Sequence, residues 1–310
     1  MSYIFIVIVN YNTRELLDRC LESIFSGSLS LEKSVIVVDN NSEDGSKELI
    51  TQKWPQVKLI SNSDNRGYAP ACNQGLKISD ANYVMAINTD AFLVGDSLAE
   101  MVSFMEENPD VCAVGPKQVR ENGELVPQCA RRRPTLLSLF IYYSGLGWRL
   151  QFLNSFSRRI LPLEHYDSVQ DVEILCGACI VFRRSALEKV GLLDDRLILN
   201  FDDIEWCERA ARHNCRIVYL PKARVIHLGG QSGMAEISRG LQENIRSSFR
   251  YFDISFRWPS SLLLKLTIVG GIAWSLAKDS VLAPFSRQRR SLLPARSRLF
   301  LSSLRMIYNP

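Results

Sequence analysis

The sequence predicts an α/β fold, in which helices flank an open and mostly parallel sheet, followed by a helical C-terminal extension. Four short runs of β-branched and other apolar residues occur within the first 90 residues, and helical patterns separate them. Such runs are typical of strands buried on both faces of a parallel sheet, and their alternation with helices indicates right-handed crossovers. After Gly230 the pattern is mainly helical to the end of the chain.

The apolar runs are the predicted strands, in order along the chain. They are YIFIVIV from Tyr3, SVIVVD from Ser34, VKLI from Val57 and YVMAIN from Tyr83, with EILCGACIVF, CRIVYLP and ARVIHLGG as later candidates. The first run is too short to be the apolar core of a signal peptide with a cleavage site, so we interpret it as a buried strand.

The segments between the first strands carry helical patterns. In TRELLDRCLESIF the apolar residues share one helical stripe, and Thr13 is the expected N-cap. EDGSKELITQK and PACNQGLKIS are the second and third predicted helices. Ligands of such sheets bind at the carboxyl ends of the strands, where Asn10, Asp39 and the segment Asn88–Asp90 stand.

The length of the chain and its cysteine content limit the possible domain organisation and cellular compartment. The 310 residues leave room for one large α/β domain with an appendage, or for two modest domains. The eight cysteines do not have the pattern of a disulfide framework, so we expect a reducing, cytosolic compartment. Cys176 and Cys179 form a CxxC, but on a predicted strand their side chains face opposite sides, and no second CxxC completes a zinc site.

Two segments suggest a membrane surface as a partner. Within residues 131–165, the run RRRPTLLSLFIYYSGLGWRLQFLNSFSRR is aromatic, apolar and basic, and could cover an active site or face a membrane. The run SSLLLKLTIVGGIAWSLAK is shorter than the roughly 20 residues of a spanning helix and contains Lys265. With Trp258, Trp274 and basic flanks, it favours a helix lying in the interface, with a buried core helix as the alternative.

The charge distribution supports the same interpretation of the tail. No acidic residue follows Asp279, whereas six arginines do: Arg287, Arg289, Arg290, Arg296, Arg298 and Arg305. A basic and partly apolar tail suggests an anionic membrane surface or a nucleic acid, and a solvated tail is the simpler alternative.

Two loops after strands offer groups for a nucleotide. In VVDNNSEDGS, Asp39 could accept a hydrogen bond from a nucleobase N–H, although Asn, Asp and Ser also favour plain turns. In NSDNRGYAPACNQGL, Gly67 permits a close approach or a positive φ, and Asn65, Arg66 and Asn73 offer donors to a nucleotide or its phosphates. A polar loop without a ligand is the equal alternative there.

Two further strand ends suggest a metal site. Asn88 and Asp90 are two residues apart in AINTDAF, which would place their side chains on one face of a strand. A carboxylate there can bind a divalent ion that bridges two phosphates. His227 ends the run ARVIHLGG, and near Asp90 it would form a mixed oxygen and nitrogen site that suits Mn²⁺ as well as Mg²⁺.

The stretch NFDDIEWCERA concentrates acidic residues at a predicted helix start. Asp202 and Glu205 have the spacing of a capping box, and Glu205–Arg209 and Glu208–Arg212 are i,i+4 pairs. Asp203 is then the carboxylate least needed for local structure. Backbone N–H groups at a helix start keep such a carboxylate ionised, as a general base requires.

In this order the motifs resemble the family 2 glycosyltransferases of the GT-A fold, closest to their rhamnosyltransferase-like branch. The matching blocks are NYN, VVDNNSEDGS, DNRGYAPACNQG, INTD, CGACIVFRRSALEKVGLLDD, NFDDIEWCERA and LPKARVIHLGGQS. The resemblance covers roughly Met1 to Ser232. It implies a Rossmann-like GT-A domain over residues 1–232, with residues 131–165 as an excursion near the acceptor or membrane, and a helical, membrane-associating extension over residues 233–310.

The resemblance also implies a nucleotide-sugar donor, a divalent metal (Mn²⁺ or Mg²⁺) and inversion at the anomeric carbon. The residues that it assigns to the donor are Asn10, Asn12, Asp39, Asn65, Arg66, Gly67, Asn73, Asn88 and Asp90. Asp90 and His227 would be metal ligands, and Asp202–Asp203 would be the acidic pair whose second member is the catalytic base. The chain departs from the family at three residues: Thr89 replaces a usual proline, Asp202 replaces a glutamate, and Trp206, beside Glu205 in the expected acceptor pocket, replaces a leucine.

The resulting hypothesis is an inverting transferase that moves L-rhamnose from dTDP-rhamnose to a lipid-linked or cell-envelope glycan of the O-antigen type. The alternatives are a family 2 transferase that uses a UDP-sugar and a non-catalytic nucleotide-sugar-binding scaffold. A sugar nucleotidyltransferase is disfavoured because NYNTRE lacks the glycines of a triphosphate loop. We expect a cytoplasmic protein bound peripherally to the inner face of the plasma membrane, without a nucleic-acid partner; homo-oligomerisation is left open.

Overall fold

The computed structural model describes residues 3–27, 31–144, 165–229, 237–282, 284 and 287–308, without the side chains of 237–240 and 287–292. The chain forms two compact units. The first takes in the described residues of Met1–Arg133, Leu161–Ile198 and Asp202–Ala235. The second takes in those of Pro134–Ile160, Leu199–Phe201 and Glu236–Pro310.

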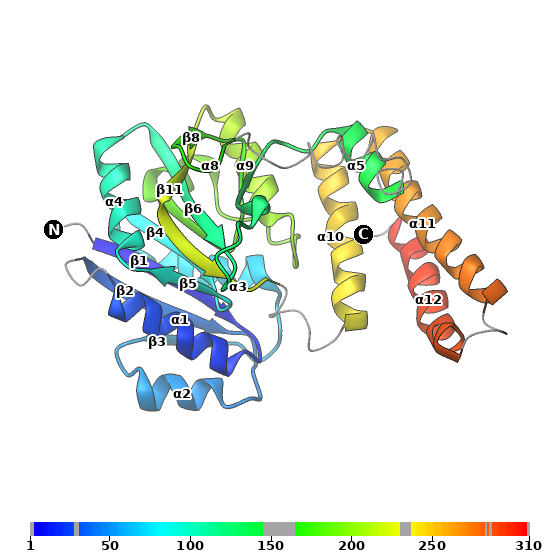
Figure 1. Ribbon diagram of the computed structural model, residues 1–310, viewed down its shortest axis with the longest axis horizontal. Helices are drawn as coiled ribbons and strands as arrows, with labels where there is room; N and C mark the ends of the chain where they lie inside the picture. The colour runs from blue at the N-terminus through cyan, green and yellow to red at the C-terminus, as the bar shows by residue number, and fades with distance from the viewer. Residues whose placement is uncertain are drawn as a thin grey trace. The chain divides into compact units, whose positions relative to one another are not determined.

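A nine-stranded mixed sheet is the centre of the first unit (Figure 1). Its parallel half has the order β3-β2-β1-β4, formed by β1 (Tyr3–Asn10), β2 (Glu32–Asp39), β3 (Lys58–Ser61) and β4 (Tyr83–Asn88). These four strands are the four predicted from the first apolar runs, and the parallel pairing is confirmed.

The other half of the sheet mixes directions. The order continues β10-β6-β11-β5, formed by β10 (Cys179–Arg183), β6 (Val111–Val119), β11 (Arg216–His227) and β5 (Ala91–Val94). Strand β10 is antiparallel to both β4 and β6, whereas β11 is parallel to β6 and antiparallel to β5. The short strand β8 (Gln170–Asp171) pairs with β11, and β7 (Ala130–Arg131) and β9 (Ile174–Leu175) form a separate two-stranded sheet.

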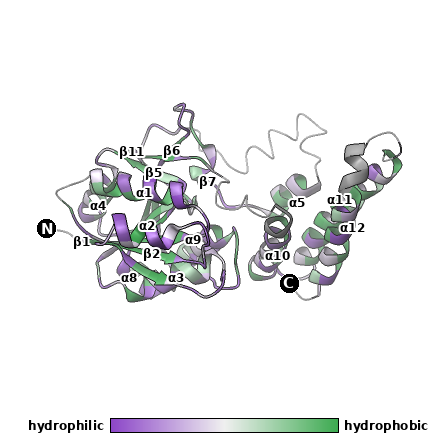
Figure 2. Cartoon of the chain, turned by 90° about the horizontal axis from the view of Figure 1, so that it is seen from below, coloured by the Kyte–Doolittle hydropathy of each residue, from purple (hydrophilic) through white to green (hydrophobic). Residues whose placement is uncertain are grey.

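Helices cover both faces of the main sheet. On one face, Ile6 and Ile8 of β1 belong to one buried cluster with Leu17 and Leu21 of α1 (Arg14–Ser26). The same cluster includes residues of α2 (Ser46–Lys53) and α4 (Ser97–Glu107). Apolar residues concentrate in the strands, whereas the helices are mixed (Figure 2).

The opposite face carries α3 (Tyr68–Ile78) and α9 (Asp202–Arg212), with α8 (Arg184–Val190) following β10. The helix α3 packs closely on β1, since a Cβ at Gly75 would lie 2.5 Å from Val7 Cγ1. Trp206 of α9 packs edge-on against Phe182 of β10, with ring centroids 4.7 Å apart. The carboxyl ends of the strands therefore emerge between helices on both faces.

One local prediction is confirmed in position and another was wrong. Thr13 is the N-cap residue of α1 as expected, but its hydroxyl donates to Asn10 Oδ1 and lies 2.9 Å from the Thr89 hydroxyl, and the Asp44 carboxylate accepts the Arg14 N–H instead. The run EILCGACIVF is not one strand, since residues 176–178 interrupt it between β9 and β10. Among the described residues no group of three His, Cys, Asp or Glu has metal-site geometry, and every described cysteine is a free thiol.

The second unit is helical. It consists of α5 (Leu136–Ser144), α10 (Ile237–Ser255), α11 (Ser260–Leu282) and α12 (Arg287–Met306). The helix α11 extends past the predicted apolar run to 23 residues, and by length and composition it could cross a membrane. The expectation that this segment is too short for crossing was therefore wrong.

Two of the three charged residues of α11 lie against other helices, whereas Lys278 is exposed. Lys265 is buried and lies 2.6 Å from Asp253 of α10, and Asp279 is buried 2.9 Å from Arg296 of α12. The exposed large apolar side chains of α11 are Leu263, Leu266, Trp274 and Val281. Lys265 thus does not interrupt the apolar surface. Residues 145–164 of the predicted excursion and the predicted boundary after Ser232 lie outside the described residues.

Candidate active site

Parallel pairing brings three of the predicted site residues to one edge of the sheet. Asn10 is in register with Asp39, and Val9 is in register with Asn88. Strands β1, β2 and β4 therefore end at the same level, and each has a polar residue at its carboxyl end, as the apolar runs predicted.

Asp39 organises the loop after β2. It is fully buried, and its Oδ2 accepts a hydrogen bond from Asn10 Nδ2 at 2.8 Å. Its Oδ1 accepts one from the Ser42 N–H at 2.9 Å, and Ser42 Oγ in turn accepts from the Asn12 N–H. Asn12 has a positive φ of 52° and its Oδ1 accepts from the Glu43 N–H. Asn10, Asn12 and Asp39 thus form one connected network at the predicted nucleoside position.

The loop after β3 is fixed by Gly67. This residue has a φ of 86°, and a Cβ there would lie 2.1 Å from Ile198 Cγ2. Asn65 Oδ1 accepts the Gly67 N–H at 3.0 Å, and the Tyr68 N–H donates to the Ile198 carbonyl at 2.8 Å. The predicted close approach at Gly67 is therefore to the protein's own chain. Arg66 stays half-exposed beside Asp64, with its guanidinium open to a ligand.

Asn73 has a different role from the predicted one. It is buried, its Nδ2 donates to the Leu193 carbonyl at 2.8 Å and to Asp195 Oδ1 at 2.5 Å, and its Oδ1 accepts the Leu193 N–H. Both amide hydrogens and the amide oxygen are in use. Asn73 therefore fastens the segment around Leu193 to α3 and is not available to a nucleotide.

Asp90 and His227 meet because of the pairing between β5 and β11. The last rung of that antiparallel ladder joins Ala91 to His227, and the Leu228 N–H donates to the Asp90 carbonyl at 3.0 Å. Asp90 Oδ1 then lies 3.7 Å from His227 Nε2. Our reasoning from a shared strand face of Asn88 and Asp90 was wrong, because β4 ends at Asn88 and Asp90 lies in a turn.

In the part of the chain that the structure describes, two buried side-chain oxygen atoms near His227 are without hydrogen bonds. Among the described residues, the buried Asn88 Oδ1 and Asp90 Oδ1 have no hydrogen-bond partner. Burial lowers the pKa of His227, which favours the neutral imidazole that binds metals. A carboxylate, an amide oxygen and a neutral imidazole suit Mn²⁺ or Mg²⁺ when phosphate oxygens and water complete the coordination. These residues fit a divalent ion that is shared with a diphosphate.

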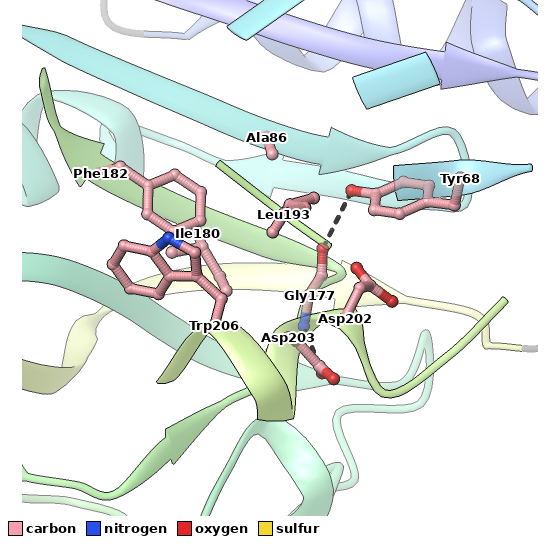
Figure 3. Close-up of a pocket in the computed structure, with 9 residues that line it drawn as sticks. All are labelled: Tyr68, Ala86, Gly177, Ile180, Phe182, Leu193, Asp202, Asp203 and Trp206. Atoms are coloured by element: carbon pink, nitrogen blue, oxygen red, sulfur yellow. Dashed lines mark hydrogen bonds between the residues drawn. The ribbon is translucent and has the colours of Figure 1, made fainter. Parts of the chain in front are cut away.

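The acidic pair lies at the start of α9, beside the interruption between β9 and β10 (Figure 3). Asp203 Oδ2 accepts the Gly177 N–H at 2.9 Å, and Oδ1 accepts the Ile204 N–H at 2.8 Å. Arg131 Nη2 lies 3.7 Å from Asp203 Oδ2. Asp203 is thus an anchored carboxylate, and our reasoning that local structure does not need it was wrong.

The predicted capping box does not form. Glu205 forms a two-pronged ion pair with Arg209, at 2.8 Å from both Nε and Nη2, and Glu208 lies 3.6 Å from Arg212. The two i,i+4 pairs are confirmed. Because Glu205 is 2% exposed and Trp206 is 1% exposed, with the Trp206 indole N–H bonded to the Gly191 carbonyl, neither side chain is open to an acceptor.

Asp202 has a buried carboxyl with a raised pKa. Burial, with smaller contributions from Asp203 and Glu205, raises the pKa of Asp202 to about 8. Its carboxyl lines a small pocket with Tyr68, Trp206 and further apolar side chains (Figure 3). No ion pair to Asp202 occurs among the residues that the structure describes. At neutral pH the protonated form of this carboxyl therefore predominates, which reduces the negative charge next to Asp203.

Residues Gly177 and Ala178 connect the candidate metal site at Asn88 and Asp90 to the acidic pair. The Asn88 N–H donates to the Ala178 carbonyl at 2.9 Å, and the adjacent Gly177 N–H is held by Asp203. Sequence reasoning missed the supporting residues Gly177 and Arg131, together with Gln118, whose Oε1 lies 2.9 Å from His227 Nδ1. The only signals for them were the glycine in CGAC and the basic run RRRP.

The chain is similar to one protein family and to a relative whose activity is named. The family model described as glycosyl transferase family 2 matches residues 5–191. An N-acetylglucosaminyl-diphospho-decaprenol L-rhamnosyltransferase of Mycobacterium tuberculosis is 28% identical over 241 residues, which are 72% of this chain and 75% of the relative. The match to the family model covers more than half of the chain.

Two solved structures share the fold. One is the mannosyltransferase PcManGT of Pyrobaculum calidifontis in complex with GDP-Man and Mn²⁺, with a TM-score of 0.55 and 17% identity over 99% of this chain and 87% of that one. The other is GalNAc-T7 with UDP, GalNAc and Mn²⁺, with a TM-score of 0.57 and 15% identity over 99% of this chain and 57% of that one. The GT-A fold is therefore confirmed, and the protein is a glycosyltransferase: the chain belongs to glycosyl transferase family 2.

Proposed function

We propose that this enzyme is an inverting transferase that moves L-rhamnose from dTDP-rhamnose to a hydroxyl of a lipid-linked, cell-envelope glycan. The donor sugar and the lipid-linked acceptor are supported by the name of the mycobacterial relative. The observation that carries the mechanism is the anchored carboxylate of Asp203 beside a buried Asp202, since inversion requires one positioned base and no enzyme nucleophile.

Asp203 is the group that would take the proton from the acceptor hydroxyl. The N–H groups of Gly177 and Ile204 fix its orientation, and the Arg131 guanidinium lies 3.7 Å from its Oδ2. Burial raises the pKa of the neighbouring Asp202, so this neighbour adds little negative charge beside the base at neutral pH. Fixed orientation matters because the attacking oxygen and the anomeric carbon must be aligned for in-line displacement.

Asp90, His227 and the amide oxygen of Asn88 would hold the Mn²⁺ or Mg²⁺ ion. When bound, such an ion neutralises the charge that develops on the departing nucleoside diphosphate. Asn10, Asn12, Asp39 and the loop of Asn65–Gly67 would form the nucleotide end of the site, where Arg66 is half-exposed and paired with Asp64.

The decisive test compares wild type with Asp203→Asn in the presence of Mn²⁺ and a panel of nucleotide sugars. We expect transfer to fall by about 10²- to 10⁴-fold in the variant, because the base is lost, while protection of the variant by dTDP-rhamnose against thermal unfolding persists. Near-normal turnover by Asp203→Asn would overturn the assignment of the base. Protection by UDP-sugars alone would reject rhamnose, and binding without turnover for every acceptor would indicate a scaffold.

We further propose that the second unit attaches the enzyme to the inner face of the plasma membrane. The support is the exposed apolar side chains of α11 together with arginines in α12, because apolar contact and anionic lipid attraction act together. Trp274→Glu should reduce co-sedimentation with anionic vesicles, whereas Ile78→Glu, on an exposed apolar position of α3, should not. Equal binding by both variants would contradict attachment through α11.

A further inference from the structure

Gln118 is a buried polar residue in the sheet, next to the position proposed for the metal. It is fully buried in β6, and its Oε1 lies 2.9 Å from His227 Nδ1. Among the described residues its Nε2 has no oxygen or nitrogen partner, and the Gln118 side chain interacts weakly with the Cys176 thiol. A buried amide that uses only part of its hydrogen-bonding capacity lowers stability relative to an apolar side chain, so packing alone does not account for it.

Strand pairing explains how the two side chains meet. Gln118 is in register with Val225 on the neighbouring strand β11, and His227 lies two residues further along that strand. Because residues at i and i+2 share a face, the His227 imidazole lies on the same face as Gln118 and diagonally beside it. The contact is therefore built into the register of β6 and β11.

The distances distinguish two tautomers of His227. If Nδ1 carries the proton, it donates to Gln118 Oε1 at 2.9 Å and leaves the lone pair of Nε2 directed toward Asp90. If Nε2 carried the proton, Asp90 Oδ1 would face it at 3.7 Å, which is too long for a hydrogen bond. The geometry therefore favours a proton on Nδ1 and a free lone pair on Nε2.

We propose that Gln118 is a positioning residue that fixes the tautomer and orientation of His227, so that Nε2 is available to a divalent metal held with Asp90. Outer hydrogen bonds of this kind commonly set the tautomer of a metal-binding histidine. The inference rests on the metal site of the proposed function and adds a residue that does not touch the ion. Its effect is transmitted through His227.

The first experiment is ¹⁵N NMR of histidine-labelled, metal-free wild-type protein at neutral pH. The chain has three histidines, and the exposed His165 and His213 serve as internal references. We expect His227, assigned by His227→Ala, to show a proton on Nδ1 alone. A proton on Nε2 in the wild type would overturn the proposal, and this outcome does not depend on whether any variant folds.

The second experiment measures Mn²⁺ binding by electron paramagnetic resonance for wild type, Gln118→Leu and Gln118→Glu. Gln118→Leu removes the acceptor, and we expect it to lose the single tautomer and to bind Mn²⁺ about 10- to 100-fold more weakly. Gln118→Glu keeps an acceptor for Nδ1–H, and we expect it to retain the tautomer and most of the affinity.

The outcomes separate this inference from the proposed function. Wild-type affinity and tautomer in Gln118→Leu would overturn the role of Gln118 alone. If wild type does not bind Mn²⁺, both the metal site of the proposed function and this inference fail. Loss of Mn²⁺ affinity in Gln118→Leu, in an enzyme that proves to use another sugar donor, would support the inference while the rhamnose assignment falls.

Discussion

The carboxylate of Asp203 accepts a hydrogen bond from the Gly177 N–H at 2.9 Å, and this bond joins the start of α9 to the interruption between β9 and β10. The proposed base is thus positioned by a residue 26 places earlier in the chain. Its orientation depends on how closely the two backbones approach.

Gly177→Ala should displace the base without unfolding the protein. A Cβ at this position would lie 3.2 Å from Asp203 Cβ, so the carboxylate must shift by a few tenths of an ångström. We expect kcat to fall about tenfold with little change in donor binding, because in-line attack tolerates small misplacement poorly. Steady-state kinetics with donor titration measures both quantities. Gly270→Ala, where a Cβ would meet nothing within 4 Å, should leave kcat unchanged.

The buried Asp202 predicts a pH-dependent stability. Its pKa is raised from 3.8 to about 8 in the folded state, so between these values the folded chain holds a proton that the unfolded chain has released. The free energy of unfolding should therefore fall as pH rises through this window and level off above about pH 8.

Urea denaturation of wild type and Asp202→Asn from pH 4 to pH 9 measures this contribution. The variant lacks the titrating group, so wild type should lose stability relative to Asp202→Asn as pH rises toward 8. Asp64→Asn removes an exposed carboxylate and should follow the wild-type curve. Parallel curves for wild type and Asp202→Asn would contradict the raised pKa.

Gly67→Ala should destabilise the first unit. The added methyl group would lie 2.1 Å from Ile198 Cγ2 at a φ of 86°, which combines overpacking with backbone strain. We expect a loss of about 3 kcal/mol in the free energy of unfolding. Gly123→Ala has the same backbone strain at a φ of 82° with no atom within 4 Å, and should lose only about 1 kcal/mol. Equal losses would show that the contact with Ile198 is unimportant.

Arg131→Met should weaken catalysis. Its guanidinium lies 3.7 Å from Asp203 Oδ2, so the variant loses a cation that helps to hold the proposed base in place. We expect kcat to fall about tenfold, with little change in donor protection against thermal unfolding. The exposed neighbour Arg132→Met provides the control for loss of charge in the same run. Equal kcat values for the two variants would contradict the role of Arg131.

The sequence was sufficient for features that depend on local pattern. Apolar runs located the ends of β1, β2, β4 and β11, and so placed Asn10, Asp39, Asn88 and His227 correctly at strand ends. Parallel strands terminate at one edge, which is why a one-dimensional pattern predicted a three-dimensional cluster.

Features that depend on distant contacts could not be predicted in this way. Asn73 has the composition of a ligand-binding residue, but its amide is used by Leu193, 120 residues away. From the sequence, Gln118 is only a residue in the middle of a strand. Its contact with His227 depends on the register of β6 and β11. The capping box of Asp202 and Glu205 did not form because the Glu205 carboxylate pairs with Arg209, which also donates to the carbonyls of Val190 and Leu192.

The rung between Ala91 and His227 has a consequence for how this chain tolerates insertions and deletions. Strand β5 has four residues, and adding or removing one residue between Asn88 and Ala91 would carry Asp90 away from the imidazole or turn it to the opposite face. The length of the two-residue connection between the end of β4 and the start of β5 is therefore fixed by the side chain that it must deliver to His227.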